Sequence, residues 1–201
     1  DFAIDFWVRF ESLHDAAETF VSQYQNDSNR WFFYKAATSD GNKLGFISVS
    51  GGATRSEVKM TNDWSGVANN TWYHIAISRS GSSYGMFING VAQPLTVLTS
   101  FEESASVSAS MQIGMYNSTI MPLYGSIDEF RLSKGVYRYN PAGTGFTAPT
   151  QPYGNGSNYF LIGFKRSLQG VKFYVNSGNT LASTMVVKEW QGSSWSELAV
   201  T

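Results

Sequence analysis

Apolar and polar positions alternate along much of the chain, which is the period of a half-buried β-strand. In FAIDFWVRF, residues 2–10, the side chains of Ile4, Phe6, Val8 and Phe10 share one face. Patterns of the same kind occur at residues 19–24, 31–38, 43–50, 71–80, 83–90, 108–115 and 122–133. Turn dipeptides such as Asp-Gly and Asn-Gly separate several of them. This arrangement predicts an all-β fold, a two-sheet antiparallel sandwich of the jelly-roll kind. Short helical turns are expected only at residues 14–18 and 133–139.

The strand pattern changes near residue 150. FTAPTQPYGNGSN, residues 146–158, has the Pro- and Gly-rich composition of a linker. We therefore expect a sandwich over residues 1–153 and a small β module over residues 154–201, with a hairpin turn at residues 191–193. Such a short module is marginally stable alone, so we expect it to dock, to continue, or to be completed by another chain. Because the chain starts directly on a strand pattern, we also expect its true start to lie upstream of Asp1.

Composition and charge narrow the class of partner. Aromatic residues make up 15% of the chain and charged residues 14%, with 19 glycines, which is typical of a turn-rich β protein. The net charge of −1 provides no basic field for a phosphate backbone, so nucleic acid is not expected as a partner. The chain has no cysteine, which rules out disulfides and thiolate metal sites. No apolar run reaches the roughly 20 residues of a membrane helix.

Two adjacent carboxylates, Asp128 and Glu129, lie within YGSIDEFRLSKGVYRY, residues 124–139. Paired carboxylates are the acid and base of many glycosidases. In a regular strand, however, neighbouring side chains leave opposite faces. Alternation places Ser126, Phe130 and Leu132 with Asp128, and Ile127 and Arg131 with Glu129. No second carboxylate follows at two or four residues, so this strand alone cannot supply the pair, about 5 Å apart, that retaining hydrolysis needs.

A structural role is the alternative for these carboxylates. Glu129 is expected to form an ion pair or a backbone cap with Arg131 or Arg138, since a buried carboxylate needs such partners. We therefore expect Asp128, Glu129, Arg131 and Arg138 to hold one corner of the fold together.

Calcium is a second candidate chemistry, because carboxylate and amide oxygens on loops are its preferred ligands. Asp63 and Asp40 are the candidate ligands. Neither loop has the ordered spacing of a calcium-binding loop, so solvated turns are the alternative. His14 and His74 do not form part of a catalytic or metal-binding motif.

Glycan binding needs an exposed aromatic ring with amide or carboxylate groups beside it. Asn62, Asp63 and Trp64 offer these groups in one loop, although Trp64 would serve equally well as a plug that closes the loop. Further candidates are Trp31, Tyr116 and Asn117.

Three segments, taken in order, resemble the concanavalin A-like lectin/glucanase superfamily in its laminin G-like (LamG) branch. They are FAIDFWVRF, NTWYHIAISRSGSSYGMFINGV and YGSIDEFRLSKGVYRYNPAGTGFTAPTQPY. The resemblance implies a jelly-roll sandwich over roughly residues 1–153. Because the family usually has one or two strands before the position of FAIDFWVRF, it also implies one or more strands upstream of Asp1. Glucanases of this superfamily carry their acid and nucleophile four residues apart on one strand, a pattern that this chain lacks. Residues 170–198 resemble a small β module of phage structural proteins.

These resemblances imply a non-catalytic structural or binding module of a larger virion-associated protein, such as a phage tail, fibre or capsid-surface protein, used for surface attachment. Other protein subunits would then be its partners. The alternative is a carbohydrate-binding adhesin domain of a secreted bacterial surface protein, with a glycan as partner. A glycoside hydrolase is the third hypothesis. The expected location is a virion or the extracellular surface of a cell.

Overall fold

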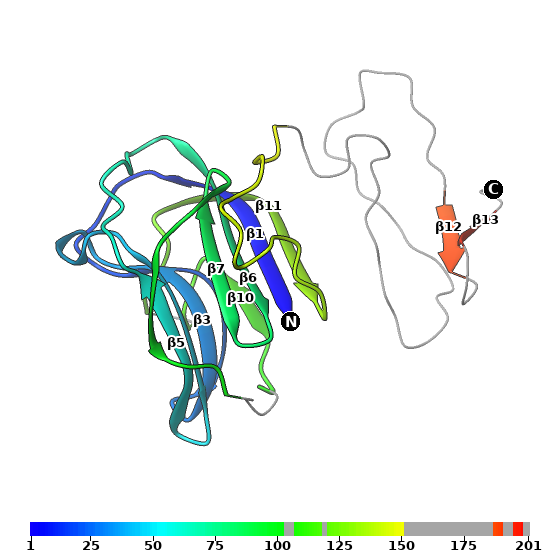
Figure 1. The fold of residues 1–201 in the computed structure, drawn as a ribbon, viewed down its shortest axis with the longest axis horizontal. Coiled ribbons are helices and arrows are strands. Elements are labelled where there is room, and N and C mark those ends of the chain that lie inside the picture. The colour runs from blue at the N-terminus through cyan, green and yellow to red at the C-terminus, as the bar shows by residue number, and fades with distance from the viewer. Residues whose placement is uncertain (103–106, 118–119, 151–186, 191–194, 199–201) are drawn as a thin grey trace. The chain divides into compact units, whose positions relative to one another are not determined.

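The structure, a computed structural model, describes residues 1–102, 107–117, 120–150, 187–190 and 195–198. The chain divides into two compact units, residues 1–158 and 159–201. The first unit is a sandwich of two antiparallel sheets, which confirms the predicted fold class (Figure 1).

One sheet has five strands in the order β11-β1-β6-β7-β8 and the other has six in the order β10-β2-β3-β4-β5-β9. The five are β11 (Gly125–Lys134), β1 (Phe2–Phe10), β6 (Trp72–Ser80), β7 (Ser83–Ile88) and β8 (Val91–Ala92). The six are β10 (Met111–Ile113), β2 (Glu18–Asn26), β3 (Asn29–Lys35), β4 (Leu44–Ser50), β5 (Ala53–Met60) and β9 (Leu95–Thr99). Strands β10 and β11 each lie at an edge of their sheet.

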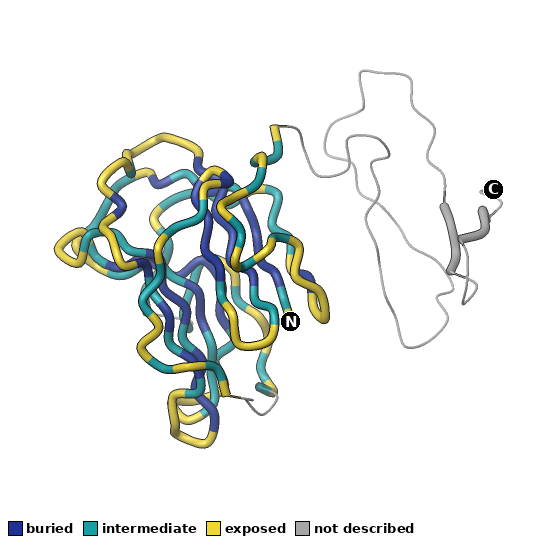
Figure 2. The backbone as a smooth tube through the Cα atoms, in the orientation of Figure 1, coloured by how far each residue is buried: buried dark blue, intermediate teal, exposed yellow. Residues whose placement is uncertain are grey.

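The core lies between the two sheets. The predicted inward faces of β1 and β6 are correct, since their alternating apolar side chains belong to one buried cluster. Phe6 of β1 meets Phe20 of β2 at 5.1 Å between ring centroids, and Phe20 meets Phe33 of β3 edge-on at 5.4 Å. Figure 2 shows that the buried residues lie mainly along the strands and the exposed residues mainly in the loops. Aromatic packing of this kind joins the sheets and fixes their separation.

A segment after β11, residues 139–146, crosses the outer face of the five-stranded sheet and is called the strap. The rings of Tyr139 and Phe146 stack with their centroids 3.7 Å apart. The Phe146 N–H donates to the carbonyl oxygen of Gly90 at 2.8 Å, and its ring meets Phe87 edge-on at 5.2 Å. His74, which points outward from β6, is therefore fully buried.

Some local predictions were wrong. Strands β5 and β9 were not predicted, because ATRSEVKM of β5 is mostly polar and LTVLT of β9 is short and lacks a regular apolar alternation. The helical turns expected at residues 14–18 and 133–139 do not form, and a 3-10 turn lies instead at Thr38–Asp40. Glu18 is already extended as the first residue of β2, where it pairs with Lys35 on the neighbouring strand at 3.2 Å.

In the second unit, β12 (Val187–Trp190) pairs with β13 (Trp195–Leu198) in an antiparallel arrangement that aligns Trp190 with Trp195. The expected hairpin turn at residues 191–193 and the rest of the tail lie outside the described residues, as does the domain boundary near residue 153. Within the residues that the structure describes, no helix is long and apolar enough to cross a membrane.

Candidate functional site

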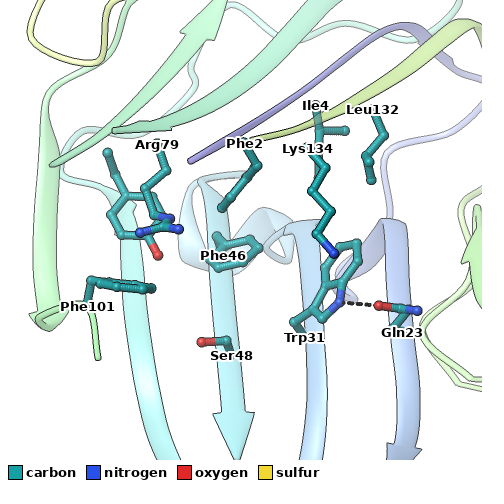
Figure 3. A pocket seen from close by; sticks show the side chains of 11 residues that line it. Phe2, Ile4, Gln23, Trp31, Phe46, Ser48, Arg79, Phe101, Leu132 and Lys134 are labelled. Atoms are coloured by element: carbon teal, nitrogen blue, oxygen red, sulfur yellow. Dashed lines mark hydrogen bonds between the residues drawn. The ribbon is translucent and has the colours of Figure 1, made fainter. Parts of the chain in front are cut away.

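A cleft with a volume of about 290 Å³ opens between the inner faces of the two sheets at one end of the sandwich (Figure 3). The first residues of β1 and the last residues of β11 and β6 form one wall. Strands β2, β3 and β4 form the other. Pockets that bind small ligands begin at about 300 Å³, so the cleft suits a small molecule or one end of a larger one.

The floor of the cleft is aromatic. Phe46 of β4 lies at its centre, with ring centroids 5.5 Å from Phe2, 6.2 Å from Trp31 and 5.8 Å from Tyr84. The Tyr84 hydroxyl accepts a hydrogen bond from Ser56 Oγ at 2.7 Å, and burial raises the pKa of Tyr84. The four rings come from both sheets, so the floor exists only once the sandwich has formed.

Trp31 is held in one orientation. Its Nε1–H donates to Gln23 Oε1 at 2.7 Å, and Gln23 Nε2–H in turn donates to the carbonyl oxygen of Ala109 at 2.8 Å. Gln23 and Trp31 face each other directly in the β2–β3 ladder. The indole is half-buried. A fixed, partly exposed indole loses little conformational entropy when a ligand stacks on it.

Cations stand at the rim. The Arg79 guanidinium lies over the ring of Phe101, 3.8 Å from the centroid, and 5.6 Å from that of Phe2. Lys134, the last residue of β11, lies on the other side of Phe2 in the view of Figure 3. The cleft thus offers stacking surface at its floor and positive charge at its edge.

None of the described residues that line the cleft is a carboxylate. These lining residues therefore do not supply the acid and base of a glycosidase. Among the described residues, no three His, Cys, Asp or Glu side chains gather closely enough to hold a metal ion.

The loop that contains Asn62, Asp63 and Trp64 does not line the cleft. Trp64 is only 6% exposed and packs edge-on against Phe10 and Tyr73, at 5.9 and 4.9 Å. Its ring faces are therefore covered, which matches the loop-plug alternative. Ligand binding by Asn62 and Asp63 stays a prediction.

The two calcium candidates lie on neighbouring loops. The Trp64 N–H donates to the carbonyl oxygen of Gly41 at 2.8 Å, which joins the loop of Asp63 to the turn that contains Asp40. The Asp63 carboxylate pairs with Lys43 Nζ at 3.1 Å. This ion pair competes with any cation for Asp63, and calcium binding stays a prediction.

Of the further glycan candidates, Trp31 lies in the cleft and Tyr116 does not. Tyr116 covers the outer face of the six-stranded sheet, with ring centroids 4.7 Å from Phe32 and 5.1 Å from Tyr24. Asn117 accepts a hydrogen bond from the Ile120 N–H at 3.0 Å. Sequence reasoning did not identify Arg79, Phe101 or Lys134 as site residues, because nothing local in their sequence places them beside Trp31.

The predicted corner is organised around Asp5, which the sequence did not single out. Arg131 binds the fully buried Asp5 carboxylate through Nε at 3.1 Å and Nη2 at 2.7 Å. The Tyr139 hydroxyl donates to the same carboxylate at 2.9 Å, and His74 Nε2 lies 3.5 Å from it. Burial, and then the Asp5 charge, raise the pKa of Tyr139 to about 12. Arg138 donates to Ser133 Oγ.

A β-bulge at Glu129 corrects the expected alternation. Glu129 has a φ of +53°, and its N–H donates to Asp128 Oδ1 at 2.8 Å. The register shifts here, between the pairs Trp7–Asp128 and Asp5–Arg131. Phe130 consequently turns into the core, where it stacks on Phe6 with centroids 6.0 Å apart. The predictions that Phe130 and Leu132 share the Asp128 face, and that Ile127 shares the face of Arg131, were therefore wrong.

A comparison with protein families identifies the superfamily of the sandwich. A family model described as the concanavalin A-like lectin/glucanases superfamily matches residues 1–140. The chain belongs to this superfamily. The resemblance of the three sequence segments is thereby confirmed, whereas the phage-like resemblance of residues 170–198 is not shown.

Several solved structures are similar to this superfamily member. Domain 4 of an extracellular arabinanase from Geobacillus stearothermophilus, in complex with arabinotriose, is 21% identical, with a TM-score of 0.47. That match covers 68% of this chain and 59% of the arabinanase domain. The CBM40 module of a Ruminococcus gnavus IT-sialidase is 16% identical, with a TM-score of 0.48 and coverage of 63% and 72%. Domains LG4-5 of the mouse laminin α1 chain are 14% identical, with a TM-score of 0.47 and coverage of 75% and 41%. No curated protein sequence matches the chain.

Proposed function

We propose that the sandwich is a non-catalytic carbohydrate-binding module of a larger extracellular or surface protein. The observation that carries this proposal is the cleft, where Trp31 is held in place beside Phe46 and Phe2. The flat C–H face of a sugar ring packs on aromatic rings, and polar groups at the rim satisfy its hydroxyls. The superfamily, which by name includes lectins, is consistent with this chemistry.

The non-catalytic part of the proposal is supported by the placement of the carboxylates. None is among the described residues that line the cleft, and Asp128 is bonded within the β11 bulge. The sequence of β11 also lacks two carboxylates four residues apart, the spacing of the acid and nucleophile in glucanases of the superfamily. Turnover of a β-glucan by the chain, lost in Glu129→Gln, would overturn this part.

Surface attachment is the proposed purpose of glycan binding. A secreted bacterial adhesin and a virion-associated protein both use such modules, and the resemblance of residues 170–198 is what favours the virion context. Protein subunits are the proposed further partners. Leu132 on β11 and Met111 on β10 are each 42% exposed at sheet edges, where another chain can pair.

A glycan array tests the proposal with matched tryptophan variants. The wild-type chain should bind a subset of glycans, and Trp31→Ala should abolish that signal. Trp72→Ala is the control, because Trp72 is 41% exposed and does not line the cleft. If no glycan binds, or if Trp31→Ala binds as well as wild type, the cleft is not a carbohydrate site.

A further inference from the structure

The cleft has two cations at its rim, Arg79 and Lys134, and no Asp or Glu among its described lining residues. Within the described residues, neither Arg79 nor Lys134 has a carboxylate at ion-pair distance. Glu102, which follows Phe101, is paired with Arg55 at 2.7 Å instead. Because the whole chain has a net charge of −1, the positive charge of the cleft is local and not a general property of the surface.

Arg79 is fixed in place before any ligand arrives. Its guanidinium stacks on Phe101, and Nη1 donates to the carbonyl oxygen of Gly81. This carbonyl is its only hydrogen-bond partner among the described residues, so other N–H donors are left for a ligand. Phe101 is anchored in turn by the neighbouring Glu102–Arg55 pair.

Lys134 is placed by the ladder between β1 and β11. It lies opposite Phe2 in that register, so its side chain starts beside the aromatic floor. Its side chain is exposed, and no hydrogen bond or ion pair with a described residue holds it away from the cleft. A flexible ammonium group of this kind can follow the charged substituent of a ligand.

From this arrangement we propose that the cleft selects sugars with a negatively charged substituent, either a carboxylate or a sulfate. The inference rests on the proposed carbohydrate-binding function. The sugar ring packs on Trp31 and Phe46, and its anionic group lies at the rim with Lys134 or Arg79. Partial exclusion of water by the aromatic floor strengthens this attraction relative to a fully exposed ion pair. The volume of about 290 Å³ suits one or two sugar units at the end of a glycan.

The test uses an array that contains neutral, carboxylated and sulfated glycans, probed at 50 and 500 mM NaCl. The wild-type chain should bind acidic glycans and should lose most of its signal at high salt, because salt screens the attraction. Lys134→Gln and Arg79→Gln should each weaken binding about threefold to tenfold. Lys59→Gln, which removes the same charge outside the cleft, should bind like wild type. The glycans that the wild-type chain binds show whether the cleft prefers a carboxylate or a sulfate.

Failure of this inference can be told apart from failure of the proposed function. If neutral glycans bind as well as acidic ones, with Trp31→Ala inactive and both charge variants unaffected, the carbohydrate site stands and charge selection is wrong. If no glycan binds, both are wrong. Thermal unfolding of each variant checks that the fold is intact. If Arg79→Gln is less stable than wild type, the result for Lys134→Gln decides, because Lys134 is exposed.

Discussion

Arg131 on β11 binds Asp5 on β1 through two hydrogen bonds, although 126 residues separate them. Asp5 is fully buried, whereas the Arg131 side chain is 28% exposed. The pair lies on the outer face of the five-stranded sheet, under the strap residue Tyr139, whose hydroxyl binds both partners. It therefore joins the edge strand β11 and its neighbour β1 to the segment that covers them.

Removing Arg131 should destabilise the sandwich strongly. Arg131→Leu leaves the Asp5 carboxylate buried without its guanidinium, and we expect the free energy of unfolding to fall by about 3 kcal/mol. Urea denaturation measures this loss. Arg55→Leu breaks the more exposed pair with Glu102 and should cost less than about 1 kcal/mol. Equal losses in the two variants would show that burial of Asp5 does not govern the effect.

The Asp5–Arg131 pair also shows where sequence reasoning stops. Alternation correctly placed Ile4 and Phe6 in the core, because the period of a strand is a local property. It failed at Glu129, since a bulge depends on the register with the partner strand. The partner of Arg131 is equally non-local, so the sequence suggested the neighbouring Glu129 and missed Asp5.

The candidate site was only partly predictable for the same reason. Trp31 was recognised as a possible sugar-stacking residue from its type. The other members of the cleft, such as Phe46, Arg79 and Lys134, lie on strands of both sheets that meet only in the folded sandwich. For Trp64 the sequence left a ligand contact and a loop plug open, and only the fold shows that its ring is buried against Tyr73.

Stability should fall at high pH because of Tyr34. Burial, followed by the Glu57 and Asp40 charges, raises the pKa of Tyr34 from 10.0 to about 12. Between these values the unfolded chain releases its phenolic proton while the folded chain keeps it. The free energy of unfolding should therefore decrease as the pH rises from 10 to 12. Urea denaturation at pH 9 and pH 11.5 should show a smaller decrease for Tyr34→Phe than for wild type. An identical decrease would mean that Tyr34 titrates alike in both states.

The strap should depend on the absence of a side chain at Gly90. Gly90 has a φ of +80°, and a Cβ there would overlap the carbonyl oxygen of Phe146. We expect Gly90→Ala to cost about 3 kcal/mol, from left-handed backbone strain together with displacement of the strap. Gly51→Ala is the matched control, because Gly51 has a φ of +61° and open space around it. It should cost only the backbone strain, about 1 kcal/mol.

Hydrogen exchange separates the two contributions at Gly90. If the strap is displaced, the Phe146 amide loses its hydrogen bond to Gly90 and should exchange much faster in Gly90→Ala than in wild type. Gly51→Ala should leave that amide protected. Unchanged protection in Gly90→Ala would show that the strap absorbs the new methyl group without moving.

Gln23 should determine how well the cleft is organised before a ligand binds. Gln23→Met keeps the length of the side chain but removes the acceptor for Trp31 Nε1–H, so the indole becomes free to rotate. The affinity for the glycan with the strongest array signal should fall about threefold to tenfold in a calorimetric titration. The indole N–H resonance of Trp31 should also shift and exchange faster, a readout that needs no ligand. Gln25→Met, on the same strand outside the cleft, should change neither quantity. An unchanged affinity together with a shifted indole resonance would show that the orientation of Trp31 is not what the ligand requires.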